Sequence, residues 1–90
     1  MDKPTAIQQA VWAQLSEHYT PPQTGNEVFS QAPYGFGRAQ MLAFLQGVAL
    51  RLQPNFVFAY QNVSVDESLG WTVNYFCQAI LDEVNPAPAD

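Results

Sequence analysis

Charged side chains are scarce in this chain, and basic side chains are the scarcest. Only three of its 90 residues are Lys or Arg, against eight Asp or Glu, so the formal net charge is −5 at neutral pH. Proteins that bind nucleic acids neutralise several phosphates with Lys and Arg. Lys3, Arg38 and Arg51 are too few and too scattered for such a patch. The composition therefore argues against nucleic-acid binding, and the absence of an acidic run argues against mimicry of DNA.

Cysteine and histidine occur once each, as Cys77 and His18. A single cysteine forms no internal disulfide and no secretory signal opens the sequence, so we expect a cytoplasmic location. We expect Cys77 to be a small buried hydrophobic residue, and His18 to be a half-buried imidazole bonded to a carbonyl. A metal site needs several ligands, and the sequence offers neither a second His nor a Cys pair. It therefore predicts no metal, no cofactor and no catalytic residues, and a protein that is not an enzyme.

Long hydrophobic runs are also missing. No apolar run approaches the roughly 18 residues that a membrane-spanning helix requires, so the sequence predicts no membrane segment. The hydrophobic fraction of 48% nevertheless supports one folded core. Only 12% of the residues are charged, about half of the roughly 25% that is usual in soluble domains. Because so few charges protect a surface poorly against association, we expect a homodimer or a stable protein partner.

Apolar residues recur at helical spacing along most of the chain, which predicts a mostly α fold: a small single-domain bundle with short helical or extended connectors. Prolines follow the first two helical segments, and a Ser-x-x-Glu capping box precedes the third. The three main helices are expected over about residues 4–19, 38–53 and 65–84. They make one domain over residues 1–84, and the Pro/Ala-rich tail at residues 85–90 is expected to be disordered.

Two connecting segments have weaker patterns. Thr24 and Glu27 have capping-box spacing, which favours a single helical turn at that point. Residues 55–63 form a short apolar run that is either a strand or a buried helical turn. Since no second strand is evident, we favour a short helix or an extended connector, while pairing of this run across a dimer stays open.

The segment QAPYGFGRAQ at residues 31–40 places two glycines directly before a helix. It does not fit a dinucleotide-binding loop, because Gln40 takes the place of the third glycine and no clear strand precedes it. Three interpretations stay open. The segment is a turn that buries Tyr34 and Phe36, an aromatic loop exposed for protein contact, or a backbone site where Arg38 helps to hold one anion.

The predicted last helix carries aromatic side chains on two sides. Beyond its core stripe, Trp71 and Tyr75 fall on the opposite face, together with Gln78 and Asp82. Tyr and Trp are frequent energetic anchors of protein interfaces. Either a connecting segment covers these two rings, or they are exposed for contact with another protein.

These features predict a small acidic, non-catalytic protein-binding module of the adaptor, assembly-factor or inhibitor type. The alternative is a structural homodimer that closes over the same aromatic surface. A ligand-binding or enzymatic domain is the least favoured, because a helical domain of this size has little room for a pocket. The expected interface residues are Trp71, Tyr75, Gln78, Asp82, Tyr34, Phe36 and Arg38.

Overall fold

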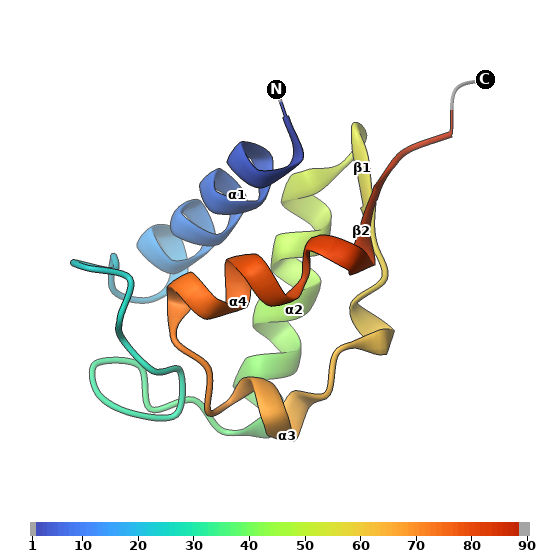
Figure 1. The fold of residues 1–90 in the computed structure, drawn as a ribbon. Helices are drawn as coiled ribbons and strands as arrows, with labels where there is room; N and C mark the ends of the chain where they lie inside the picture. Colours follow the sequence, from blue (N-terminus) through green and yellow to red (C-terminus); the bar gives the residue numbers. More distant parts are fainter. Residues whose placement is uncertain (1, 89–90) are drawn as a thin grey trace.

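The computed structural model describes residues 2–88 and is mostly helical (Figure 1). Helix α1 covers Lys3–His18 and helix α2 covers Arg38–Leu52, which confirms the first two expected helices almost to the residue. The Asp2 carboxylate caps α1 by accepting a hydrogen bond from the Thr5 backbone N–H at 3.2 Å. Within residues 2–88, no helix is long and apolar enough to cross a membrane.

Helices α1 and α2 pack side by side and supply much of the core (Figure 1). A polar contact joins them at one edge, where Arg51 donates its Nε–H to the side-chain oxygen Oε1 of the buried Gln14 at 2.7 Å and also pairs with Glu17. Gly47 makes room for this contact, since a Cβ there would lie 2.2 Å from Gln14 Nε2. The fully buried residues of these two helices are Ile7, Val11, Leu15, Met41, Phe44, Leu45 and Val48.

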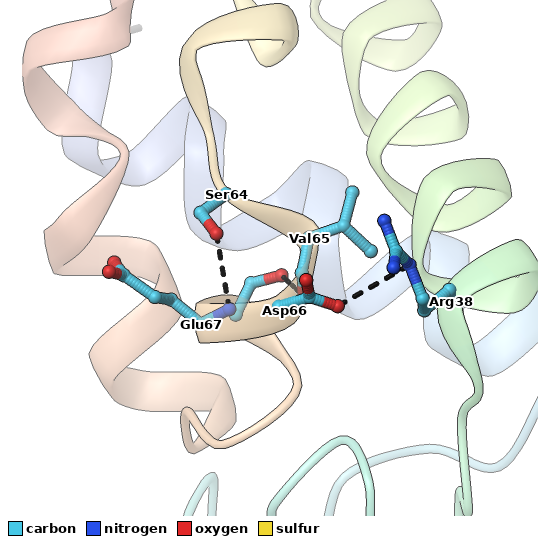
Figure 2. A network of polar contacts seen from close by, with 6 residues as sticks. Arg38, Ser64, Val65, Asp66 and Glu67 are labelled. Carbon is cyan, nitrogen blue, oxygen red and sulfur yellow. Dashed lines mark hydrogen bonds and ion pairs between the residues drawn. The ribbon is translucent and has the colours of Figure 1, made fainter.

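The single helix expected over residues 65–84 is wrong, because the chain turns in the middle of it. Helix α3 covers only Val65–Ser68, and helix α4 covers Val73–Ala79. Each has its own N-cap: Ser64 Oγ accepts from the Glu67 backbone N–H (Figure 2), and Thr72 Oγ1 accepts from that of Tyr75. The 3₁₀ turn η2 (Leu81–Glu83) follows α4.

The break between α3 and α4 is held by backbone pairing with a distant loop. The Trp71 carbonyl accepts a hydrogen bond from the Phe29 N–H at 3.2 Å, and the Val73 N–H donates to the Glu27 carbonyl at 3.0 Å. Val28 and Thr72 form an isolated antiparallel bridge between these contacts. The turn therefore exchanges helical hydrogen bonds for bonds to the loop.

A short antiparallel sheet forms from the ambiguous run at residues 55–63, for which we favour a short helix or an extended connector from the sequence, and from the tail that the sequence predicts to be disordered. Strand β1 (Phe56–Phe58) pairs with strand β2 (Val84–Pro86) of the same chain, and the 3₁₀ turn η1 (Tyr60–Asn62) follows β1. The expectation of disorder is therefore wrong at residues 85–86, while residues 89–90 of that tail lie outside the described residues. Pro86 stands opposite Phe56, and the pairs on either side of them carry the ladder hydrogen bonds. The absence of a backbone N–H at Pro86 therefore removes no ladder hydrogen bond from the sheet.

The helical turn expected at residues 24–27 is also wrong. The Glu27 carboxylate instead accepts hydrogen bonds from the backbone N–H groups of Gln23, Thr24 and Gly25, at 2.8–3.2 Å. Hydrogen bonds from its own N–H and from these three groups lower the pKa of the Glu27 carboxyl. This side chain therefore holds a non-helical loop.

Candidate protein interface

The Phe36 ring is part of the core. It is only 5% exposed, and its centroid lies 4.6 Å from that of Tyr19 and within 6 Å of those of Phe29 and Phe44. A backbone hydrogen bond holds the loop at the same residue, because the Phe36 N–H donates to the Phe29 carbonyl at 2.8 Å. Of the three interpretations of this segment, the buried turn is correct, and the prediction of Phe36 as an interface residue is wrong.

Tyr34 lies at the border of the same aromatic cluster. Its ring packs 5.6 Å from that of Phe36, and although the residue is half-buried, its hydroxyl oxygen is fully buried and has no hydrogen-bond partner within residues 2–88. Burial, with a smaller effect of the Glu27 carboxylate, raises the pKa of Tyr34 to about 12. Tyr34 is thus a neutral phenol that covers the core, and it offers a partner little free surface.

Arg38 begins α2 and reaches towards α3 (Figure 2). Its Nε lies 3.3 Å from Asp66 Oδ1, and both side chains are mostly exposed, so the pair contributes little to stability. The Gly37 N–H at this helix start donates to Gln40 Oε1 at 3.1 Å. Since Gln40 and Asp66 already bind these groups, the geometry does not favour an anion site here.

The pairing of Trp71 with Tyr75 agrees with its prediction. Their ring centroids are 5.3 Å apart, although Trp71 precedes α4 rather than lying within it. Trp71 is half-buried and packs on Phe76 of the core at 6.2 Å. Tyr75 is 56% exposed, the highest exposure of any aromatic residue among the large hydrophobic side chains of residues 2–88. The pair thus combines an anchored ring with an exposed one.

The two polar residues expected beside this pair are placed differently. Gln78 is exposed on α4, one turn after Asn74. Asp82 is exposed as well but belongs to η2. Because α4 ends at Ala79, Asp82 is not in helical register with Tyr75 and Gln78. It stands beyond the end of the helical surface.

Trp12 is an interface candidate that the sequence reasoning did not identify. It is half-buried and lines a groove of about 260 Å³ between α1 and α4, together with Asn74, Cys77 and Gln78. The signal was its offset from the apolar stripe of α1, which leaves one side of the ring uncovered. Gln78 lines the groove, and Tyr75 is its neighbour on α4, three residues earlier in the helix. We call this region the α1–α4 surface; it consists of Gln8, Trp12, Trp71, Asn74, Tyr75 and Gln78.

The single cysteine and the single histidine lie in different surroundings. Cys77 is half-buried at the groove, and burial raises the pKa of its thiol to about 11, so it is protonated and unreactive at neutral pH. His18 is exposed in the last turn of α1, so the expected half-buried imidazole is wrong. Across residues 2–88, no group of three His, Cys, Asp or Glu side chains is placed to hold a metal ion.

A second and larger groove corrects the expectation that so small a domain has little room for a pocket. It has a volume of about 790 Å³ and lies between α1 and the segment that joins α2 to β1. Ala6, Ala10 and Ala13 line one wall, and Arg51 is its charged residue. The Arg51 guanidinium is already engaged by Glu17, and among residues 2–88 no acid, base or nucleophile lines the groove. This groove therefore has no evident chemistry.

Comparison of the chain with protein-family models, curated proteins and solved structures finds no match. The uncharged aromatic α1–α4 surface is the feature of the described residues that most resembles the centre of a protein interface, where aromatic side chains are enriched and charges are depleted.

Proposed function

We propose that this protein is a non-catalytic module that binds another protein through the α1–α4 surface. The observation that carries the proposal is the exposed Tyr75 ring, 56% exposed and packed on Trp71 at 5.3 Å. A tyrosine that is held on one side by a second ring loses little freedom on binding and buries a large apolar area. Such residues supply much of the binding energy in protein complexes.

The groups around Tyr75 fit the same function. Trp12 and the amide side chains of Gln8, Asn74 and Gln78 border the groove beside it, and none of them is charged. An amide both donates and accepts hydrogen bonds, and it costs less to bury than a carboxylate or an ammonium group. Asp82, just beyond α4, is suited to the polar rim of such an interface.

An adaptor, an assembly factor or an inhibitor would each use a surface of this kind. We place the function in the cytoplasm, because the only cysteine of the chain has no partner for an internal disulfide. The partner that we propose presents an uncharged, concave patch that can accept the Tyr75 ring.

The proposal is tested by placing a photo-crosslinking phenylalanine analogue at residue 75 in the native host and identifying the crosslinked protein by mass spectrometry. Binding of the purified partner is then measured by calorimetry. Tyr75→Ser is expected to weaken it at least about 30-fold, the loss of roughly 2 kcal/mol that marks an anchor residue. Because Tyr75 is mostly exposed and loses only its packing on Trp71, the free energy of unfolding should fall by no more than about 1.5 kcal/mol.

Val57→Ser is the matched control, because Val57 is 50% exposed but lies on β1. It should leave the dissociation constant unchanged. Crosslinking at residue 57 that captures the same protein as residue 75, or equal affinity of the Tyr75→Ser variant, contradicts the proposed surface.

A further inference from the structure

The outer side of α2 is apolar although it faces solvent. Five exposed residues share this side: Ala39, Leu42, Ala43, Gln46 and Leu50. Leu42 is 42% exposed and Leu50 is 68% exposed, the highest value among the exposed large hydrophobic residues. A helix at the surface of a monomer normally carries charged and polar residues on this side. We call these five residues the outer α2 stripe.

The outer α2 stripe is separate from the α1–α4 surface. The inner side of α2 faces α4, since the Phe44 ring packs 5.4 Å from that of Phe76. Arg51 is turned towards α1, where it bonds to Gln14 and Glu17. The stripe therefore lies on the side of α2 away from α4, and at its C-terminal end Leu50 borders α1 beside Gln14 and His18, which are not part of the α1–α4 surface.

The spacing of the two exposed leucines suits pairing across a two-fold axis. Leu42 and Leu50 stand four residues on either side of Gln46, which is one turn in each direction. We propose that a second copy of this chain covers the stripe, with the two α2 helices antiparallel and centred on Gln46. A two-fold axis then brings Leu42 of each copy opposite Leu50 of the other. The interface then contains two equivalent contacts between Leu42 of one copy and Leu50 of the other, and the two Gln46 side chains face each other on the axis.

Small residues and charge favour this antiparallel arrangement. Ala39 and Ala43 on the stripe let two helix backbones approach closely. The Arg38 side chain, 75% exposed, stands at the N-terminal end of α2. Its pair with Asp66 is exposed and weak. In the antiparallel pair its guanidinium therefore also reaches the C-terminal end of the other α2, where free carbonyls carry partial negative charge and Arg51 is already paired with Glu17. A parallel pair would instead bring the two Arg38 side chains together.

The expected strength follows from the size of the contact. One pair of helix faces buries less than the roughly 800 Å² per partner of a standard interface. We therefore expect a dimer that dissociates at micromolar concentrations. Because it uses neither α1 nor α4, this dimer leaves the α1–α4 surface free, so the two proposals succeed or fail independently.

Sedimentation equilibrium over roughly 1–200 µM protein, the range that brackets a micromolar dissociation constant, tests self-association. Leu50→Gln is expected to raise that constant about tenfold or more, without changing the charge or the circular dichroism spectrum. Val57→Gln, on β1, should leave it unchanged. A monomer throughout this range, or a dimer that Leu50→Gln does not weaken, overturns the proposal.

The orientation is tested by disulfide formation in a Cys77→Ala background. Gln46→Cys should crosslink to itself. Leu42→Cys and Leu50→Cys should crosslink with each other when mixed, and much less when each is oxidised alone. Efficient crosslinking of the Leu42→Cys protein alone indicates a parallel pair and overturns the antiparallel dimer, as does failure of the mixed pair to form.

Discussion

Replacing Phe36 with alanine tests whether the loop before α2 is part of the core. The Phe36 ring is 5% exposed and lies 4.6 Å from that of Tyr19, with three more rings within 6 Å. Truncation of a phenylalanine buried to this degree costs about 3–5 kcal/mol. A domain of 90 residues has a total stability of roughly 5–13 kcal/mol. Phe36→Ala should therefore remove a large part of the free energy of unfolding.

Urea unfolding followed by circular dichroism measures this loss, and thermal unfolding should show a decrease in Tm of at least about 12 °C. Two variants serve as controls. Phe36→Leu should keep most of the stability, because it leaves a smaller cavity. Tyr75→Ala, which removes a mostly exposed ring and its packing on Trp71, should lower the free energy of unfolding by no more than about 1.5 kcal/mol. If Phe36→Ala costs under about 1 kcal/mol, or no more than Tyr75→Ala, the packing of this loop described above is refuted.

Three further predictions concern the loop and the two ends of the chain. The folded state lowers the pKa of the Glu27 carboxyl from its ordinary value of 4.5. The Glu27 carboxylate therefore stabilises the fold at pH values above 4.5, and this stabilisation is lost as the pH falls through the lowered pKa. Glu27→Gln should lack this loss, and Tm measured from pH 7 to pH 3 should show a smaller decrease for the variant than for the wild type. Gly25→Ala should lower the free energy of unfolding more than Gly35→Ala does. Both glycines have positive φ, but only at Gly25 would a Cβ lie 2.2 Å from Asn74 Oδ1. The difference between the two variants, measured by urea unfolding, should disappear in an Asn74→Ala background. Lys3→Met should lower the free energy of unfolding by about 1–2 kcal/mol, because the Lys3 ammonium donates hydrogen bonds of 2.9 and 3.0 Å to the backbone carbonyls of Leu81 and Val84. Hydrogen exchange should show that the backbone amides of β2 lose protection. Unchanged protection would show that these bonds do not hold the strand.

Local sequence signals predicted α1 and α2 because each helix buries one continuous stripe and ends near a proline. They failed at residues 65–84, where Gly70 and the N-cap Thr72 interrupt an apolar pattern that otherwise continues. The turn is held by hydrogen bonds to Glu27 and Phe29, more than 40 residues earlier in the chain. No periodicity within the segment reports such a distant pairing. The same reason hid β2, whose partner β1 lies nearly 30 residues away.

The candidate site was predictable where it depended on neighbours in the sequence. Trp71 and Tyr75 are four residues apart and their rings pack together as expected, although the predicted helix extended beyond α4 at both ends. Phe36 was misplaced because a ring in a glycine-rich loop has the same sequence pattern whether it points in or out. Trp12 was missed because its exposure depends on where α4 crosses α1, which is a property of the tertiary fold.

The aromatic cluster around Phe29 affects how this protein folds. Phe29 belongs to no helix or strand, yet its ring lies within about 6 Å of those of Tyr34, Phe36, Phe44 and Phe76. The centre of the core is thus built from the segment between α1 and α2, which has no helix of its own to order it. Non-local contacts of this kind slow folding relative to simple helical bundles. Because the loop and the helices share this core, they should fold and unfold in one cooperative step. Insertions into residues 27–37 should be tolerated far less well than the lack of secondary structure suggests.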